Sequence, residues 1–235
     1  MASKSYRRKP IAKRKSNATS KWIFFLISFV LFLFVAIGIY KFRDGFLYYL
    51  GFKTDKNVET LSKEERKLAD IRIYEVLHKH DDKAIGFDVS EYQSEIDWEQ
   101  TYHIDESFEL SFVFIRATAG KNKVDSRFKE NWKASKEREL IRGAYHYYRP
   151  NENSIEQAEN FIKTVKLQKG DLPPVLDIEK LPKSQSIDSL KVGLRRWLNR
   201  VEKHYKVKPI IYSGESYYTD FLKEEFSEYP LWIAN

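Results

Sequence analysis

Cysteine is absent from this chain of 235 residues. Its absence excludes disulfide bonds, a thiolate nucleophile and zinc sites built on cysteine. Export from the cell is still possible, since a domain of this size can be stable through its hydrophobic core alone. Histidine is scarce: His146 fits a packed strand position, and the other four lack metal-ligand spacing. We therefore expect neither a metal site nor a cofactor.

Nucleotide-binding motifs are also missing. No G-x-G-x-x-G follows the first predicted strand, and the chain has no P-loop. The net charge of +7 would fit a nucleic-acid binder, but eight basic residues and no acid lie within residues 1–21. Without this tail the net charge is −1, so we expect no nucleic-acid partner.

A run of nineteen uncharged residues, 22–40, follows the basic tail. This is close to the ~20 residues that a helix needs to cross a bilayer. No signal-peptide cleavage site follows, so we predict one uncleaved transmembrane helix over 22–40. Basic residues precede the span and charges of mixed sign follow it. The positive-inside rule therefore predicts a cytoplasmic tail over 1–21 and a single-pass membrane protein whose remaining chain lies on the outer side.

The rest of the chain divides at about residue 84. Residues 41–83 are predicted to form a juxtamembrane linker and an amphipathic helix over about 62–80, which a capping box of Ser62 and Glu65 begins. Beyond it, strand and helix patterns alternate. The predicted strands are 84–89, 112–117, 143–148, 174–176, 209–212 and 231–234. The predicted helices are 125–139, 154–167 (begun by a capping box of Ser154 and Gln157), 186–205 and 215–226. This alternation predicts parallel β/α units, as a barrel or a doubly wound sheet.

Two carboxylates, Asp177 and Glu179, end the apolar run that begins at Leu172. On a strand, residues two apart point to the same face, so the two side chains would lie together. Two like charges this close split their pKa values and leave one acid and one base. Cleavage of a glycosidic bond uses such a pair. On spacing alone, however, two solvated acids at a strand end are the commoner meaning of the pattern.

Other polar residues at predicted strand ends favour the catalytic interpretation. In a β/α barrel, functional groups collect at the C-terminal ends of the strands. Asp88 lies at the end of the first predicted strand, Tyr145 and Tyr147 on the third, and Tyr212 on the fifth. Together with the acids of the fourth strand, they predict an anionic, aromatic-lined cleft suited to a polysaccharide.

Residues 86–98 contain Gly-Phe-Asp-Val-Ser, Gln93 and Ile-Asp-Trp, which fit the pattern G-x-D-V-S-x-x-Q-x-x-I-D-W. This pattern resembles the opening of glycoside hydrolase family 25, the Chalaropsis-type lysozymes or N-acetylmuramidases. Further segments are similar, in order, to later strands of the family, including its catalytic D-x-E strand: 112–120, 143–148, 174–179, 209–213 and 230–234.

The resemblance implies an α/β fold, a modified TIM-like β/α barrel over 84–235. It also implies cleavage of the β-1,4 bond between N-acetylmuramic acid and N-acetylglucosamine in peptidoglycan glycan strands. Glu179 matches the proton donor, and Asp177 the carboxylate that positions the N-acetyl group or stabilises the developing charge. Asp88 matches the acid at the cleft floor. The implied substrate-binding residues are Tyr145, Tyr147, Tyr212 and Arg116.

Two departures from the family pattern affect these expectations. Arg116 and Ala119 stand where the family has lysine and glutamate, so a carboxylate is lost from the second strand. The family domain also continues through further strands with another cleft aspartate, so we expect a C-terminally truncated chain and an incomplete barrel. Two functions remain open: a membrane-anchored, monomeric peptidoglycan hydrolase, or a non-catalytic, membrane-anchored peptidoglycan-binding protein on the same fold. The joint presence of Asp88, Asp177 and Glu179 favours the enzyme, because a binder needs no acid pair.

Overall fold

The computed structural model describes residues 22, 25–30, 32–33, 62–101, 103–104 and 107–234. The chain divides into two compact units, residues 1–66 and 67–235. In the first unit, residue 22 and the described residues of 25–33 are helical. No helix within the described ranges is long and apolar enough to cross a membrane. Most of 22–40, the tail over 1–21 and the linker before residue 62 lie outside those ranges, so the span and its flanks stay predictions.

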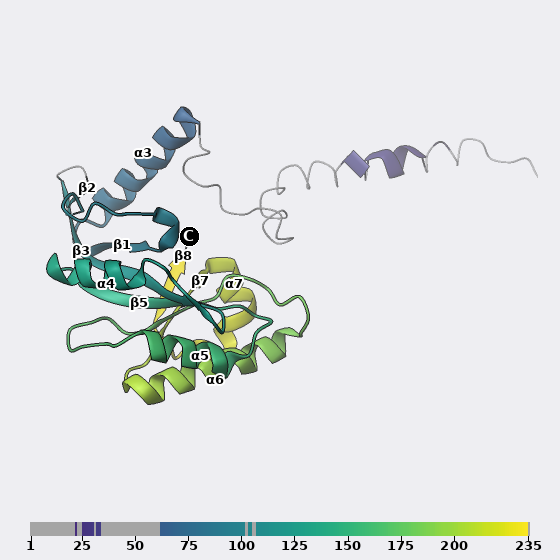
Figure 1. Cartoon of the computed structure of the whole chain (residues 1–235). Helices are drawn as coiled ribbons and strands as arrows, with labels where there is room; N and C mark the ends of the chain where they lie inside the picture. The colour runs from purple at the N-terminus through teal and green to yellow at the C-terminus, as the bar shows by residue number, and fades with distance from the viewer. Residues whose placement is uncertain are drawn as a thin grey trace, which may run out of the picture. The chain divides into compact units, whose positions relative to one another are not determined.

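The second unit is built on a curled, mainly parallel sheet (Figure 1). The strand order is β1-β3-β5-β6-β7-β8, formed by β1 (Ile85–Val89), β3 (Phe108–Ala119), β5 (Ile141–Tyr147), β6 (Val175–Asp177), β7 (Ile210–Gly214) and β8 (Leu231–Ala234). The short strands β2 (His103–Ile104) and β4 (Lys123–Val124) pair antiparallel with β3. Among the described residues, β1 and β8 each pair with a single neighbour, so the sheet is a half-barrel. The six strands that the sequence predicts are all present, although β3 begins four residues earlier than expected.

Helices connect the parallel strands, as the alternating pattern predicts. They are α4 (Phe128–Glu137), α5 (Ser154–Thr164) and α6 (Ile187–Tyr205). The segment predicted as one helix over 215–226 is divided into α7 (Glu215–Tyr217), the π-helical turn η3 (Tyr218–Leu222) and α8 (Lys223–Phe226). Before β1, α3 (Lys63–Lys79) has the predicted capping box: the Ser62 N–H donates to Glu65 Oε2 at 2.9 Å, and the Glu65 N–H to Ser62 Oγ at 3.2 Å.

The capping box predicted at Ser154 and Gln157 is wrong. The N-cap of α5 is Asn153, whose side-chain oxygen accepts hydrogen bonds from the backbone N–H groups two and three residues later, at 2.9 and 3.2 Å. An asparagine is as good an N-cap as a serine, and here it lies one residue earlier. The side chain of Gln157 is buried and binds His146 instead.

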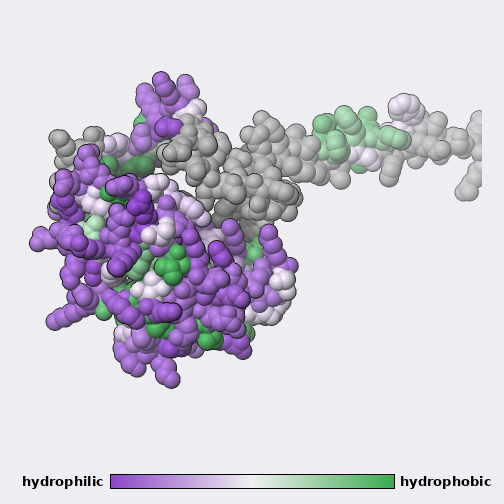
Figure 2. Space-filling model, viewed as in Figure 1, coloured by the Kyte–Doolittle hydropathy of each residue, from purple (hydrophilic) through white to green (hydrophobic). Residues whose placement is uncertain are grey.

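The two faces of the sheet have different characters. Side chains alternate between the faces of a strand, and the residues on one face of the central strands are almost completely buried and mostly apolar. These residues include Val113, Ile115, Ala144, Leu176 and Ile211. They form the core beneath the helices, while the surface seen in Figure 2 is largely hydrophilic. The opposite, inner face of the curl holds the polar and aromatic residues described below.

A β-bulge between β3 and β5 brings a hydroxyl group of β3 to a buried histidine. The register shifts between Arg116 and Thr118, which places Thr118 opposite His146. His146 Nδ1 lies 2.7 Å from Thr118 Oγ1, Nε2 lies 3.1 Å from Gln157 Oε1, and the ring stacks on Trp197 of α6 at 5.4 Å between centroids. His146 is therefore a packed, hydrogen-bonded core residue, as expected.

His146 should make the protein sensitive to mild acid. Burial lowers the pKa of His146 to about 3, whereas an unfolded histidine has a pKa of about 6.5. Below that value the unfolded state binds a proton that the folded state does not. As the pH is lowered from about 6.5 to 3, the free energy of unfolding should therefore fall by up to ~1.4 kcal/mol per pH unit. Denaturant unfolding at a series of pH values measures this slope.

A His146→Gln variant should lose most of that slope, even if it is less stable at every pH. The matched control is His204→Gln at an exposed position near the end of α6, which should keep the wild-type slope. Equal slopes in the two variants would show that His146 is not the responsible group.

Candidate active site

The pairing register brings the predicted site residues together on the inner face of the half-barrel. Residues directly opposite each other on neighbouring strands point to the same face, as do residues two apart on one strand. Asp88 is in register with Phe114, and Arg116, two residues further along β3, is in register with Tyr145. A second row crosses β5, β6, β7 and β8 and consists of Tyr147, Asp177, Tyr212 and Trp232.

Aromatic contacts across the curl confirm that these side chains share one face. The ring of Trp232 lies 4.8 Å from that of Phe114 and 4.8 Å from that of Tyr212, measured between centroids. Gly143 makes room for Phe114, because a Cβ at this glycine would lie 2.2 Å from the phenylalanine ring. The inner face therefore has an aromatic floor between its acidic residues.

Asp177 is the most deeply buried of the three predicted catalytic acids, with 6% of its surface exposed. In the described part of the chain, no donor reaches its Oδ1. Burial is the main reason that the pKa of Asp177 is well above its usual value, and the charges of Glu179 and Asp88 raise it further. Arg116 and Lys180 act in the opposite direction. The three carboxylates thus form one electrostatically coupled group, with Glu179 half-buried two residues beyond Asp177.

Asp88 and Tyr145 lie on the side of the three carboxylates that is nearest to β1. The Asp88 side chain is accessible to solvent, but the protein around it is dense enough to raise the pKa of its carboxyl group. Burial and the charges of Asp88 and Asp177 raise the pKa of Tyr145 far above its usual value, and a hydrogen bond with the Ser90 side chain counteracts this. Tyr145 consequently keeps its phenolic proton and is a hydrogen-bond donor within an acidic site.

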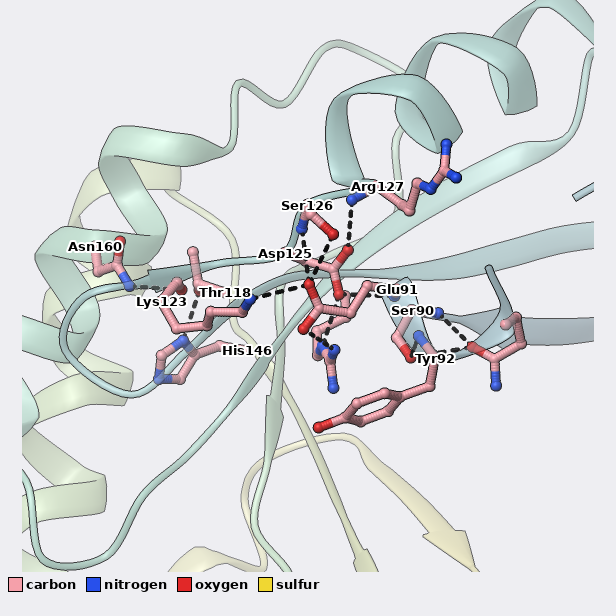
Figure 3. A network of polar contacts seen from close by, with 12 residues as sticks. Ser90, Glu91, Tyr92, Thr118, Lys123, Asp125, Ser126, Arg127, His146 and Asn160 are labelled. Carbon is pink, nitrogen blue, oxygen red and sulfur yellow. Dashed lines mark hydrogen bonds and ion pairs between the residues drawn. The ribbon is translucent and has the colours of Figure 1, made fainter. Parts of the chain in front are cut away.

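Arg116, predicted to bind substrate, is 7% exposed and is held by two carboxylates. These belong to Glu91 and Asp125, which lie next to each other in Figure 3. The Arg116 Nε donates to Asp125 Oδ2 at 2.8 Å, and its Nη2 lies 3.1 Å from Glu91 Oε1. The guanidinium carbon lies 4.4 Å from the centroid of the Tyr92 ring. Sequence reasoning missed Glu91 and Asp125, because these two residues and Arg116 come from separate segments with no recognisable spacing.

Two further residues of the site were not anticipated. Lys180 follows Glu179, and its Nζ lies 5.5 Å from the centroid of the Tyr147 ring. Trp232 packs against Tyr212 inside the curl. Across the ranges that the structure describes, no three His, Asp or Glu side chains are grouped so that they could hold a metal ion. The titratable side chains assembled on the inner face are carboxylates and phenols, with the cations of Arg116 and Lys180 beside them.

A parallel β/α half-barrel with coupled carboxylates and tyrosines at the C-terminal ends of its strands is typical of glycoside hydrolases. The sequence model of glycosyl hydrolases family 25 matches residues 87–235, and the chain belongs to this family. The resemblance drawn from the motifs is thereby confirmed.

Individual relatives agree with this assignment. The chain is 44% identical over 151 residues to the uncharacterized protein YegX of Escherichia coli K12, a match covering 64% of this chain and 55% of that protein. It is 33% identical over 162 residues to Lysozyme M1 of Streptomyces globisporus, covering 64% and 54%. The structure of a family 25 glycosyl hydrolase from Bacillus anthracis superposes with a TM-score of 0.59 at 32% identity, covering 64% of this chain and 70% of that one. The chain thus spans about half the length of the curated relatives it matches.

Proposed function

We propose that this protein is a muramidase, which hydrolyses the β-1,4 bond between N-acetylmuramic acid and N-acetylglucosamine in peptidoglycan. The observation that carries the proposal is the coupling of Asp88, Asp177 and Glu179 on the inner face of the half-barrel. A site that only bound glycan would have no use for a buried carboxylate whose pKa is raised further by two neighbouring acids, since burying it has a desolvation cost. Family membership and the similarity to Lysozyme M1 support the same activity.

Each acid has a distinct part in the proposed reaction. Glu179 protonates the glycosidic oxygen as the bond breaks, which is the general-acid step of glycoside hydrolysis. Asp177 offers an oxygen without a partner among the described residues, and this atom interacts with the substrate's N-acetyl group. The Asp88 carboxylate stabilises the positive charge that develops on the sugar ring. Water then completes the hydrolysis, and its proton returns to Glu179.

Product analysis after digestion of purified peptidoglycan tests the proposed activity. The protein should release reducing ends, and borohydride reduction of the products should yield muramitol, because cleavage leaves N-acetylmuramic acid at the new end. Glucosaminitol would identify a different bond specificity. Glycan binding without any release would favour the non-catalytic, peptidoglycan-binding alternative.

We also propose that residues 22–40 anchor the protein in a membrane, with the basic tail in the cytoplasm and residues 84–235 outside. The support is the uncharged run and the charge asymmetry around it. An alkaline phosphatase fused after Lys83 should be active in a bacterial host, since that reporter folds only outside the cytoplasm. The matched control, a fusion after Lys21, should be inactive. Protection of the Lys83 fusion from protease in intact spheroplasts would refute this orientation.

A further inference from the structure

Tyr92 is the most exposed large apolar side chain in the part of the chain that the structure describes, at 78%. It lies on the short 3₁₀ turn η2 (Glu91–Gln93), which follows β1 and Asp88 directly. A single exposed aromatic residue is common on protein surfaces and by itself signifies little. The surroundings of Tyr92 distinguish it from that ordinary case.

The backbone that carries Tyr92 is fixed on two sides (Figure 3). A capping box closes the turn, with the Ser90 N–H donating to Gln93 Oε1 at 2.8 Å and the Tyr92 N–H to Ser90 Oγ at 3.3 Å. The Glu91 N–H donates to Asp125 Oδ2 at 2.9 Å, which ties the turn to a segment more than thirty residues away. An exposed residue is therefore held on an immobilised turn.

The ring of Tyr92 is supported from below. Arg116 lies against it with Cζ 4.4 Å from the ring centroid, close enough for a cation–π contact. Asp125 and Glu91 hold the guanidinium in place, and they also compensate its charge. A ring fixed in this way loses little conformational freedom when a ligand lies on its exposed side, so the entropic cost of binding is small.

The turn that carries Tyr92 lies next to the three carboxylates of the site. Ser90, its N-cap, forms a hydrogen bond with Tyr145, and Arg116 interacts electrostatically with both Tyr145 and Asp177. A glycan strand long enough to extend past the acids on the β1 side would meet the Tyr92 ring. The flat C–H face of a pyranose is a suitable partner for such a surface, because it is apolar while its hydroxyl groups point outward.

We propose that Tyr92 is a sugar-binding platform, which stacks on a β-linked N-acetylhexosamine next to the sugar held by the acids. Arg116 is a positioning residue that holds the ring. This inference rests on the proposed function for its substrate class. It adds a binding residue that the sequence motifs did not single out and gives Arg116 an indirect role.

Kinetics on soluble glycan strands, prepared from peptidoglycan by removing the stem peptides, test the platform. Tyr92→Ala should raise KM about tenfold, in the range of base–aromatic stacking. It should change kcat by less than about twofold, because the platform binds the substrate and the transition state equally well. Tyr92→Phe and Tyr92→Trp should keep the wild-type KM. Val192→Ala, at a half-exposed apolar position on α6, is the matched control and should have no effect.

The positioning role of Arg116 is tested by a double-mutant cycle. Arg116→Lys keeps the charge but loses the planar group beneath the ring. It should raise KM in the wild-type background and leave KM unchanged in the Tyr92→Ala background. Additive effects of the two substitutions would overturn the positioning role.

Glycan affinity measured by calorimetry in the Glu179→Gln background separates this inference from the proposed activity. If no reducing ends are released by the wild type but Tyr92→Ala still weakens binding about tenfold, the platform stands and the muramidase proposal fails. Unchanged affinity and KM in Tyr92→Ala overturn the platform, as does an equal loss in Tyr92→Phe. If Tyr92→Ala proves unstable, Tyr92→Leu provides a second non-aromatic variant with the same expected loss.

Discussion

Replacing Glu179 with glutamine should reduce the rate of reducing-end release at least ~10²-fold, the lower range for loss of a general acid. Glutamine has nearly the same shape as glutamate but has no acidic proton to give to the glycosidic oxygen. Binding of glycan strands should persist, because the aromatic floor and the tyrosines of the inner face are unchanged. The measurements are initial rates on purified peptidoglycan and calorimetric affinity for soluble glycan strands.

Glu215→Gln is the matched control for this substitution. Glu215 is an exposed glutamate that follows β7, so it lies at the same end of a neighbouring strand as Glu179. The control should retain the wild-type rate. Near-normal activity of Glu179→Gln would remove this residue from the role of acid. Loss of both activity and glycan binding would instead indicate that the substitution disturbs the cleft.

The acids of the site could be predicted because their signal is local. Asp177 and Glu179 end an apolar run, and Asp88 ends another, so strand periodicity together with the rule for strand ends places all three on one edge. The parallel half-barrel follows from the same alternation of strand and helix patterns. Both arguments use only neighbours in the chain, and such neighbours are what a single sequence displays.

The residues that hold Arg116 could not be predicted, because only the fold brings them close to it. Asp125 reaches Arg116 through a turn and the short strand β4, and Glu91 comes from a different β/α unit. The wrong capping box at Ser154 has a related cause. Asn153 competes for the same N–H groups, and the side chain of Gln157 binds His146 of β5, a contact that only the fold brings about. Local patterns thus placed the three acids at one end of the sheet, whereas tertiary contacts decided which side chains surround them.

Arg142 and Asp171, which are 29 residues apart in sequence, form another ion pair that only the fold brings together. This pair lies at the end of the sheet opposite to the candidate active site. Arg142 is the second residue of β5, whereas the site is at the C-terminal strand ends. Its Nε donates to Asp171 Oδ1 at 2.9 Å, and its Nη1 donates to the carbonyl oxygen of Trp132 at 2.6 Å. The two charged side chains are only 6% and 8% exposed.

Arg142→Met should lower the free energy of unfolding by ~3–5 kcal/mol, because it leaves the carboxylate of Asp171 buried without its cation. Arg200→Met is the matched control: its ion pair with Glu159 is shorter, at 2.6 Å, but the side chains are 34% and 50% exposed. An exposed pair of this kind contributes about 1 kcal/mol or less. Denaturant unfolding of both variants measures whether burial or distance determines the loss.

The double variant Arg142→Met with Asp171→Leu separates the value of the pair from the cost of breaking it. Replacing both partners removes the unpaired charge, so most of the stability lost in Arg142→Met should return. Turnover at a temperature where all variants are folded should stay at the wild-type level, because the pair lies at the end of the sheet away from the acids. A double variant no more stable than Arg142→Met would mean that Arg142 acts mainly through Trp132, whose ring centroid lies 4.1 Å from its guanidinium carbon.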